Sequence, residues 1–260
     1  MKLVTIAMAA LVTALSPTAW ATWSVAVLNP ATGTIAVAGA SCSFMVYGIT
    51  SVLPGKGVVI VQAASNAKAR ADATAWLEAG ESLDGIMAKL IDPASGYEPA
   101  EQQYALLGVG ADARPRTYTG TRVEGAKGAV AADHVTVQAN TMVSDNVVKR
   151  TSAALGKANW ADDEAMARAV MRAMDAGAAA GGDKRCGAAN SASAFVGLYR
   201  KDDSKQQPWM ELVVYGIEPG TASAMTRLDR VFDTSIDAAM RSRSTRLFIV
   251  PATIAPDGPH

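Results

Sequence analysis

The chain has 260 residues, of which 50% are hydrophobic and 18% charged, with 24 basic and 24 acidic side chains. This composition is that of a packed globular protein rather than a disordered one. The balanced charge gives no electrostatic basis for binding nucleic acid or an anionic membrane. Its only histidines are His134 and His260, and no CxxC or HExxH motif is present. We therefore expect no metal and no cofactor.

The N-terminal segment has the pattern of a secretory signal peptide. Lys2 precedes a largely apolar run of thirteen residues, Leu3 to Leu15, and small residues stand at Ala19 and Ala21. Such a run is too short for a membrane span, which needs roughly 20 residues. We expect residues 1–21 to be removed, leaving one domain over residues 22–260 that is secreted or periplasmic and not attached to a membrane. The alternative is an uncleaved membrane anchor.

Cleavage after Ala21 would make Thr22 the first residue of the mature protein. An N-terminal threonine carries a hydroxyl nucleophile and an α-amine that can act as its base. The α-amine has an ordinary pKa near 7.7–8.0, so a useful fraction is unprotonated near neutral pH. The alternative is that Thr22 is merely the residue that cleavage exposes.

The two cysteines, Cys42 and Cys186, are predicted to form a disulfide, because an even pair in an exported protein is more often bridged than free. Such a bridge would place the glycine-rich segment 177–186 beside Ser41.

Hydrophobic patterning predicts an alternation of strand pairs and helices. Strands are expected over 22–28, 34–42, 58–63, 104–109, 116–121, 135–139, 192–199 and 210–216, and helices over 67–79, 82–91, 144–155, 162–176 and 222–240. The turn cluster at 29–33 makes the first two strands a hairpin whose far end returns to Thr22. Strand pairs with helices grouped between them indicate a layered α+β fold with antiparallel sheets.

Several polar residues are candidates for a site around Thr22. Ser41 lies at the open end of the hairpin, and Lys56 could lower the amine's pKa by its charge. The alternatives are a small strand residue and a solvated loop charge. Gln138 and Asn140 end a strand with amide donors that suit carbonyl recognition, or are edge-strand polar residues.

The segment Gly181-Gly182-Asp183 is a further candidate. Its glycine N–H groups could stabilise an oxyanion, and Asp183 could orient the amine. The alternative is a helix C-cap followed by a turn. His134 is interpreted as a surface or strand-end histidine.

The motifs TWS, NPATG, AVAGAS, VVIVQA, VQANTMVSDNVV and AGGD occur in this order along the chain. This order resembles the bacterial and archaeal family called domain of unknown function 1028, from Thr22 to about Phe232. The family looks like a member of the N-terminal nucleophile (Ntn) hydrolase superfold, a four-layer αββα sandwich of two mainly antiparallel sheets. The resemblance implies Thr22 as nucleophile, its α-amine as base, and Ser41 and Asp183 as neighbours of the site.

The sequence departs from the family in the segment after Asp183. Many members continue with Arg-Gly-[RK]-Gln, whereas this chain has Lys184-Arg185-Cys186-Gly187. The glutamine of those members therefore has no counterpart in this segment.

Taken together, we expect an exported Ntn-type amidohydrolase that acts on a small-molecule or peptide amide, with Asn140 or Gly181-Gly182 near the oxyanion. A homo-oligomer is compatible with this expectation. The alternative is a non-catalytic periplasmic ligand-binding or interaction protein on the same fold.

Overall fold

The computed structural model describes residues 21–110, 114–156, 160–205, 207–241 and 245–249. The expected signal peptide, apart from Ala21, lies outside the described residues. The strands of the structure are β1 (Thr22–Leu28), β2 (Ile35–Ser41), β3 (Thr50–Leu53), β4 (Gly57–Ala63), β5 (Gln102–Gly108), β6 (Arg116–Thr119), β7 (Ala126–Ala132), β8 (Val135–Met142), β9 (Ser193–Tyr199), β10 (Met210–Val214) and β11 (Thr245–Ile249). The α-helices are α1 (Ala67–Glu78), α2 (Leu83–Ile91), α3 (Asn146–Leu155), α4 (Asp163–Ala179) and α5 (Ala224–Arg241).

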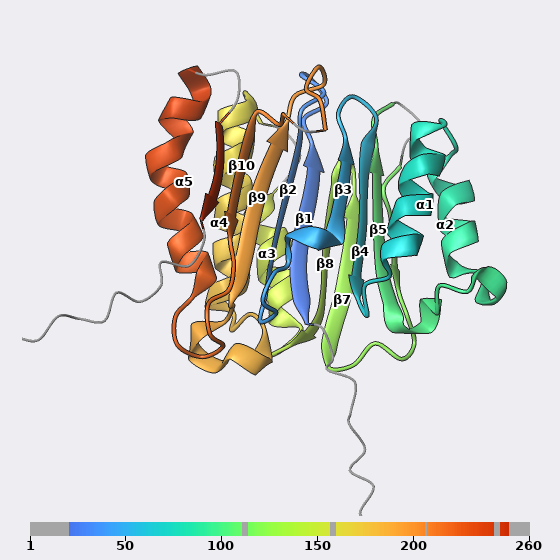
Figure 1. Cartoon of the computed structure of the whole chain (residues 1–260), viewed down its shortest axis with the longest axis horizontal. Helices are drawn as coiled ribbons and strands as arrows, with labels where there is room; N and C mark the ends of the chain where they lie inside the picture. Colours follow the sequence, from blue (N-terminus) through green and yellow to red (C-terminus); the bar gives the residue numbers. More distant parts are fainter. Residues whose placement is uncertain (1–20, 111–113, 157–159, 206, 242–244, 250–260) are drawn as a thin grey trace, which may run out of the picture.

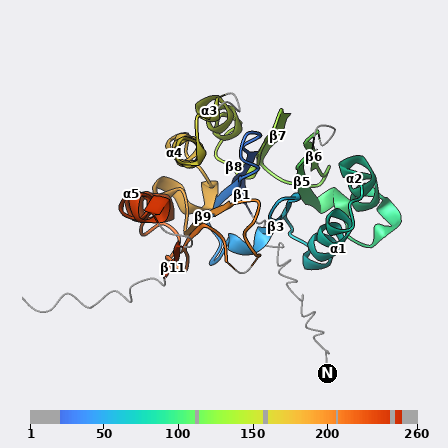
Figure 2. The same ribbon diagram turned by 90° about the horizontal axis from the view of Figure 1, so that it is seen from above.

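These elements form a four-layer αββα sandwich (Figures 1 and 2). One sheet has seven strands in the order β11-β10-β9-β2-β1-β8-β7, and the other has four in the order β3-β4-β5-β6. Helices α3, α4 and α5 cover the outer face of the larger sheet, and α1 and α2 cover the smaller one. All strand pairs are antiparallel except β10 with β11. The expected fold class is confirmed.

Strand β1 lies inside the larger sheet and is buried along its whole length. Side chains alternate across a strand, and both faces of β1 are covered. Trp23 and Val25 face α4 in the outer core, whereas Ala26 and Leu28 belong to the core between the two sheets. The same alternation places Thr22 on the face that looks toward the smaller sheet.

The turn between β1 and β2 is fixed to α4 by one carboxylate. Asp163, in the first turn of α4, accepts hydrogen bonds from Asn29 Nδ2 at 3.1 Å, Thr32 Oγ1 at 2.7 Å and Thr34 Oγ1 at 2.8 Å. The predicted hairpin is thus confirmed, and its closed end is held at the opposite end of β1 from Thr22.

The predicted helix signals also agree with the structure. Ser82 caps α2 by accepting a hydrogen bond from the amide of Gly85 at 3.1 Å. The methionine-rich face of the helix expected over 162–176 is buried in the outer core. The predictions missed β3, β7 and β11. Strand β7 has a half-exposed, alanine-rich sequence that lacks the periodic signal of a strand.

Candidate functional site

The site expected around Thr22 lies where four strands of the larger sheet end together. Thr22 on β1 is directly opposite Ser41 on β2 and Asn140 on β8, and Ser41 is opposite Ser193 on β9. Directly opposed residues of an antiparallel pair share one face of the sheet. All four residues are buried. The hairpin and the sheet register therefore bring Ser41 and Asn140 to either side of Thr22, as expected.

Polar side chains gather on the peptide bond that joins Ala21 to Thr22. The carbonyl oxygen of Ala21 accepts hydrogen bonds from Ser41 Oγ at 2.5 Å and from Arg185 Nη2 at 3.2 Å. Ala21 itself is completely buried. The bond whose cleavage would free the Thr22 amine is therefore held inside the protein by a hydroxyl and a guanidinium.

Arg185 is fixed by Asp183. The carboxylate of Asp183 accepts from Arg185 Nη2 at 2.6 Å on one oxygen and from Arg185 Nε at 3.1 Å on the other. Such a fork-to-fork pair defines both the position and the orientation of the guanidinium. Asp183 is fully buried, whereas the Arg185 side chain is 28% exposed. Asp183 therefore acts on the Thr22 region indirectly, by fixing the guanidinium that donates to the Ala21 carbonyl.

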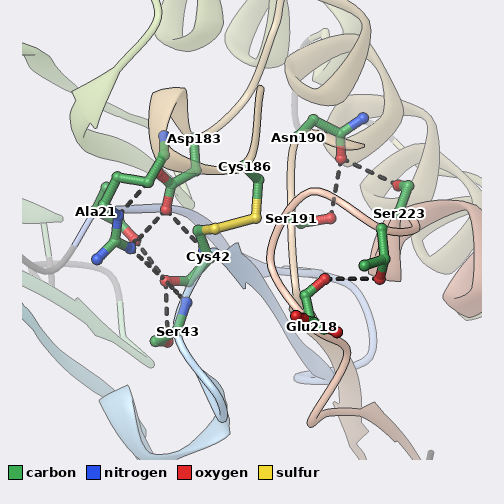
Figure 3. Close-up of a disulfide and its surroundings, with 12 residues drawn as sticks. Ala21, Cys42, Ser43, Asp183, Cys186, Asn190, Ser191, Glu218 and Ser223 are labelled. Carbon is green, nitrogen blue, oxygen red and sulfur yellow. Dashed lines mark hydrogen bonds and ion pairs between the residues drawn. A yellow bond between two sulfur atoms is a disulfide. The ribbon is translucent and has the colours of Figure 1, made fainter. Parts of the chain in front are cut away.

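The predicted disulfide between Cys42 and Cys186 is present, with the two Cα atoms 5.6 Å apart. It joins the end of β2 to the short 3₁₀ helix Lys184–Ala189, which carries Arg185. Figure 3 shows the bridge beside Asp183 and Ser43. The bridge thus brings the segment after α4 next to Ser41, as the sequence predicts.

A connected network of amide side chains lies between the two sheets under Thr22. Gln138 Nε2 donates to Ser24 Oγ, and Ser24 Oγ donates to Gln62 Oε1, both at 2.6 Å. Gln62 Nε2 donates to Gln103 Oε1 at 2.7 Å and to the carbonyl of Thr22 at 3.3 Å. Asn140 Nδ2 donates to the same Gln103 oxygen at 3.3 Å. The network ties the first residues of β1 to β4, β5 and β8.

Within the part of the chain that the structure describes, two acceptors of this network have no hydrogen-bond partner: Asn140 Oδ1 and Gln138 Oε1. Both residues are fully buried. A buried oxygen without a donor costs free energy that a donor group of a ligand or a water molecule would recover. The expected involvement of Asn140 in the site stays a prediction, and its placement beside Thr22 agrees with it.

The expected oxyanion role of Gly181 and Gly182 does not agree with the structure. The amide of Gly181 donates to Ala178 O at 2.9 Å, and that of Gly182 donates to Gly177 O at 3.1 Å. These bonds end α4, which is the alternative interpretation of the glycine-rich segment. Both glycines have positive φ, of 108° and 55°. Their N–H groups satisfy the last carbonyls of the helix and are not available to a substrate.

Lys56 and His134 lie away from Thr22. Lys56 precedes β4, whereas Gln62, which contacts Thr22, lies at the other end of that strand, about 20 Å away at 3.3 Å per residue. Lys56 Nζ instead donates to Glu78 O at 2.6 Å. His134 lies in the turn between β7 and β8, where its carbonyl accepts from the amide of Leu28. The expectation for Lys56 is wrong, and that for His134 is confirmed.

Sequence reasoning did not single out Arg185. Its role depends on Asp183 two residues earlier and on Ala21, which is 164 positions away. The Asp-x-Arg spacing in the 3₁₀ helix is the one local signal, because it places the carboxylate and guanidinium of one turn close together.

A second buried carboxylate lies between the sheets at a distance along the sheet from this site. Glu211 on β10 accepts hydrogen bonds from Tyr47 and, at 3.0 Å, from Tyr199. Burial, together with the neighbouring Tyr47 and the carboxylate, raises the pKa of the Tyr199 hydroxyl far above its ordinary value. Glu211 and Thr22 lie on strands separated by β9 and β2, so this cluster is not part of the Thr22 site.

Two further findings concern the described part of the chain. None of its helices combines the length and the apolar character needed to cross a membrane. Within the same residues, no three or more His, Cys, Asp or Glu side chains are grouped so that they could hold a metal ion.

The fold and the site define an α+β sandwich with a buried polar cluster at the first residue of an inner strand. Over residues 22–221 the chain matches the model of a family described as "Family of unknown function (DUF1028)". The protein belongs to this family, and the resemblance seen in the sequence is confirmed.

A solved structure shows the same fold. The chain is similar to the crystal structure of protein SPO2555 from Silicibacter pomeroyi, described as DUF1028, with a TM-score of 0.67. The two sequences are 20% identical, and the alignment covers 86% of this chain and 90% of that chain. At this identity the similarity concerns the fold alone. No curated protein matches the chain.

Proposed function

We propose that the protein is an exported amidohydrolase of the N-terminal nucleophile type, with Thr22 as nucleophile. The observation that carries this proposal is the concentration of polar groups on the Ala21–Thr22 peptide bond. Ser41 and Arg185 bind its carbonyl, and Asn140 lies opposite Thr22 on the neighbouring strand. Because Ala21 is completely buried, its removal would leave an opening lined by these groups.

The chemistry would proceed in two steps. Thr22 Oγ attacks the carbonyl carbon of an amide while the α-amine of Thr22 takes the hydroxyl proton. The amine then passes this proton to the leaving nitrogen, and the C–N bond breaks to give an ester on Thr22. A water molecule, whose proton the same amine takes, then attacks the ester carbonyl. The bond between Thr22 Oγ and the acyl carbon breaks, the amine returns the proton to Oγ, and the carboxylic acid leaves.

Export is supported by two independent features. The first 21 residues have the pattern of a signal peptide. The Cys42–Cys186 bridge is of the kind that persists in oxidising compartments outside the cytosol. Export and activation would then be one event, because the cleavage that releases the protein also frees the Thr22 amine.

A non-catalytic binding protein on the same fold is the second candidate. It is favoured by the amide network below Thr22, since glutamine and asparagine side chains bind polar ligands but do not transfer protons at neutral pH. In that case Asn140 Oδ1 and Gln138 Oε1 would receive donors of the ligand.

The first experiment is the intact mass and N-terminal sequence of the exported protein. A start at Thr22 is expected. Periodate then gives an independent check, because it cleaves a free 1,2-amino alcohol and would convert an N-terminal threonine to a glyoxylyl group. A start at Trp23, or a retained leader, contradicts the enzyme proposal.

The second experiment treats the mature protein with a β-lactone probe that acylates N-terminal threonines. We expect one adduct, mapped by peptide mass to Thr22. Thr22→Ser should keep the labelling and Thr22→Ala should abolish it, while Thr121→Ala, at an exposed threonine, is the matched control. Labelling that survives in Thr22→Ala would overturn the mechanism and favour the binding protein.

A further inference from the structure

The carbonyl of Ala21 belongs to an acyl group attached to Thr22. The side chains that bind this carbonyl therefore indicate how the site would bind the carbonyl of another acyl group on Thr22. Its oxygen accepts from Ser41 Oγ at 2.5 Å and from Arg185 Nη2 at 3.2 Å. In the precursor this acyl group is on the nitrogen of Thr22. In the proposed acyl-enzyme an acyl group would be on Oγ of the same residue.

We propose that Ser41 and Arg185 form the subsite that binds the carbonyl oxygen of the substrate and stabilises the negative charge that develops on it during attack by Thr22. This inference rests on the proposed function and assigns the oxyanion role that Gly181 and Gly182 do not fill. Ser41 and Arg185 are thus catalytic residues that touch the reacting carbonyl.

The hydrogen-bond pattern leaves two donors for this oxygen. Ser41 Oγ accepts from the amide of Ser43 at 3.1 Å, from the Ser43 hydroxyl at 3.0 Å and from Arg185 Nη2 at 3.3 Å, and it donates its own proton to Ala21 O. Arg185 Nη2 has two protons, and Asp183 Oδ2, at 2.6 Å, takes one of them. The other is directed toward Ala21 O and Ser41 Oγ.

Cleavage after Ala21 removes the acceptor that these two donors share. Ser41 is fully buried, and without the Ala21 oxygen its proton would turn to the Ser43 hydroxyl at 3.0 Å, an acceptor that Arg185 does not share. The mature site therefore favours a ligand that supplies an oxygen at this position. The amide carbonyl of a substrate is such a group, and it becomes a stronger acceptor when Thr22 Oγ adds to it.

The position of Ser41 suits attack by Thr22. The two residues are directly opposed on paired strands and share one face of the sheet, so their Cβ atoms lie about 4.5–5.5 Å apart. An oxygen bound to Ser41 Oγ is then next to the Thr22 side chain. This distance lets one carbonyl contact both the nucleophile and the donor.

The charge arrangement indicates which substrates fit. Asp183 balances Arg185 before the reaction, so the subsite has no net charge and suits a neutral amide better than a carboxylate. The buried carboxylate also holds the guanidinium through two oxygens and prevents its reorientation. Donors fixed in advance and aimed at developing charge are the most effective form of electrostatic catalysis.

The first test compares the full chain, which retains Ala21, with the exported chain that begins at Thr22. Arg185→Met and Ser41→Ala should each lower the melting temperature of the full chain by about 2–4 °C more than that of the mature chain. The reason is that the Ala21 carbonyl loses a donor only where Ala21 is present. Equal shifts in the two forms would contradict the contact on which the inference rests.

The second test measures the rate of β-lactone acylation of Thr22 in the mature protein. Arg185→Met should slow the acylation step by about 100-fold or more with little change in the concentration at half-saturation, as for the loss of an oxyanion donor. Arg185→Lys, which keeps the charge but not the fork, should be intermediate. Lys184→Met, at the exposed neighbouring cation, is the control and should react at the parent rate.

A spectroscopic measurement separates catalysis from a structural role. In the acyl-enzyme made with a ¹³C-labelled carbonyl, the infrared C=O stretch should lie at lower frequency in the parent than in Arg185→Met or Ser41→Ala. If Arg185→Met is acylated at the parent rate and its C=O stretch is unchanged, the inference about Ser41 and Arg185 is overturned while the proposed function stands. A mature parent that is not labelled at all contradicts the proposed function, and the melting comparison still decides whether the Ala21 contact exists.

Discussion

The carboxylate of Asp183 accepts a hydrogen bond of 2.7 Å from the backbone amide of Cys42, so the segment after α4 is joined to β2 by a polar contact as well as by the disulfide. The two links are next to each other in the sequence and depend on different chemistry. Removing one should therefore leave the other, and this allows their contributions to be measured separately.

Replacing Cys42 and Cys186 together by serine should destabilise the protein but leave Arg185 in its position near Thr22. The bridge joins residues 144 positions apart, for which the chain-entropy model gives on the order of 5 kcal/mol as an upper value. Urea unfolding of the parent and the double variant measures the loss. Because Asp183 still binds the Cys42 position through its amide, Arg185 should stay in place, and labelling of Thr22 in the double variant should continue below the unfolding midpoint.

Asp183→Ala should lower the free energy of unfolding by about 2–4 kcal/mol, because it removes the buried carboxylate that accepts from the Arg185 guanidinium through both oxygens and from the amide of Cys42. The matched control is Glu101→Ala, which removes the partner of Arg122 from an ion pair whose side chains are 43% and 63% exposed. That change should cost less than about 1 kcal/mol. Equal losses of unfolding free energy in the two variants would show that the buried Asp183–Arg185 pair stabilises the protein no more than an exposed ion pair does.

Gly177→Ala should destabilise the protein even though alanine is the better helix former. A Cβ at Gly177, inside α4, would lie 2.5 Å from Thr151 Oγ1 and 2.8 Å from Trp23 Nε1. The resulting displacement of α3 and β1 should cost about 1–3 kcal/mol. Gly85→Ala in α2 is the control, since its nearest neighbour would be Ser82 Oγ at 3.2 Å and helix propensity favours alanine by about 1 kcal/mol. Thermal unfolding of both variants provides the measurement.

Asp175 should make stability depend on pH. Burial, and then the nearby acidic Asp229 and Asp233, raise the pKa of its carboxyl from 3.8 to about 7. The folded protein therefore binds more protons than the unfolded chain between these values, and the stability from the neutral carboxyl is lost as the pH rises through 7. Asp175→Asn should stabilise the protein by about 1–2 kcal/mol at pH 8, and the gain should disappear near pH 4. A gain that does not change between pH 4 and pH 8 would contradict this cause.

Local signals in the sequence were sufficient for most of the fold. The turn at 29–33 identified the β1–β2 hairpin, and Ser82 and the methionine face of α4 identified their helices, because these features depend on neighbouring residues. Strand β7 could not be recognised because its pairing with β8, rather than its own pattern, makes it a strand. The same is true of β11, which pairs with β10 across a helix.

The site was only partly predictable. The hairpin register placed Ser41 beside Thr22, and the cysteine pair placed Asp183 there, since both are topological consequences of sequence. The sequence does not show which N–H groups are free to bind a substrate carbonyl. The amides of Gly181 and Gly182 are used by the end of α4, and Arg185 takes part because it reaches a carbonyl distant in sequence. These facts depend on three-dimensional packing that spacing does not encode.

The burial of Ala21 has a kinetic consequence for any peptidase that cuts after it. A bond between the buried residues Ala21 and Thr22, with its carbonyl bound by Ser41 and Arg185, would be closed to a peptidase cleft while β1 is paired in the sheet. Processing and folding would thus compete for the same segment, and only chains cut before β1 pairs would gain a free Thr22. Premature folding would store the protein as an inactive form, and export as an unfolded chain would prevent that loss.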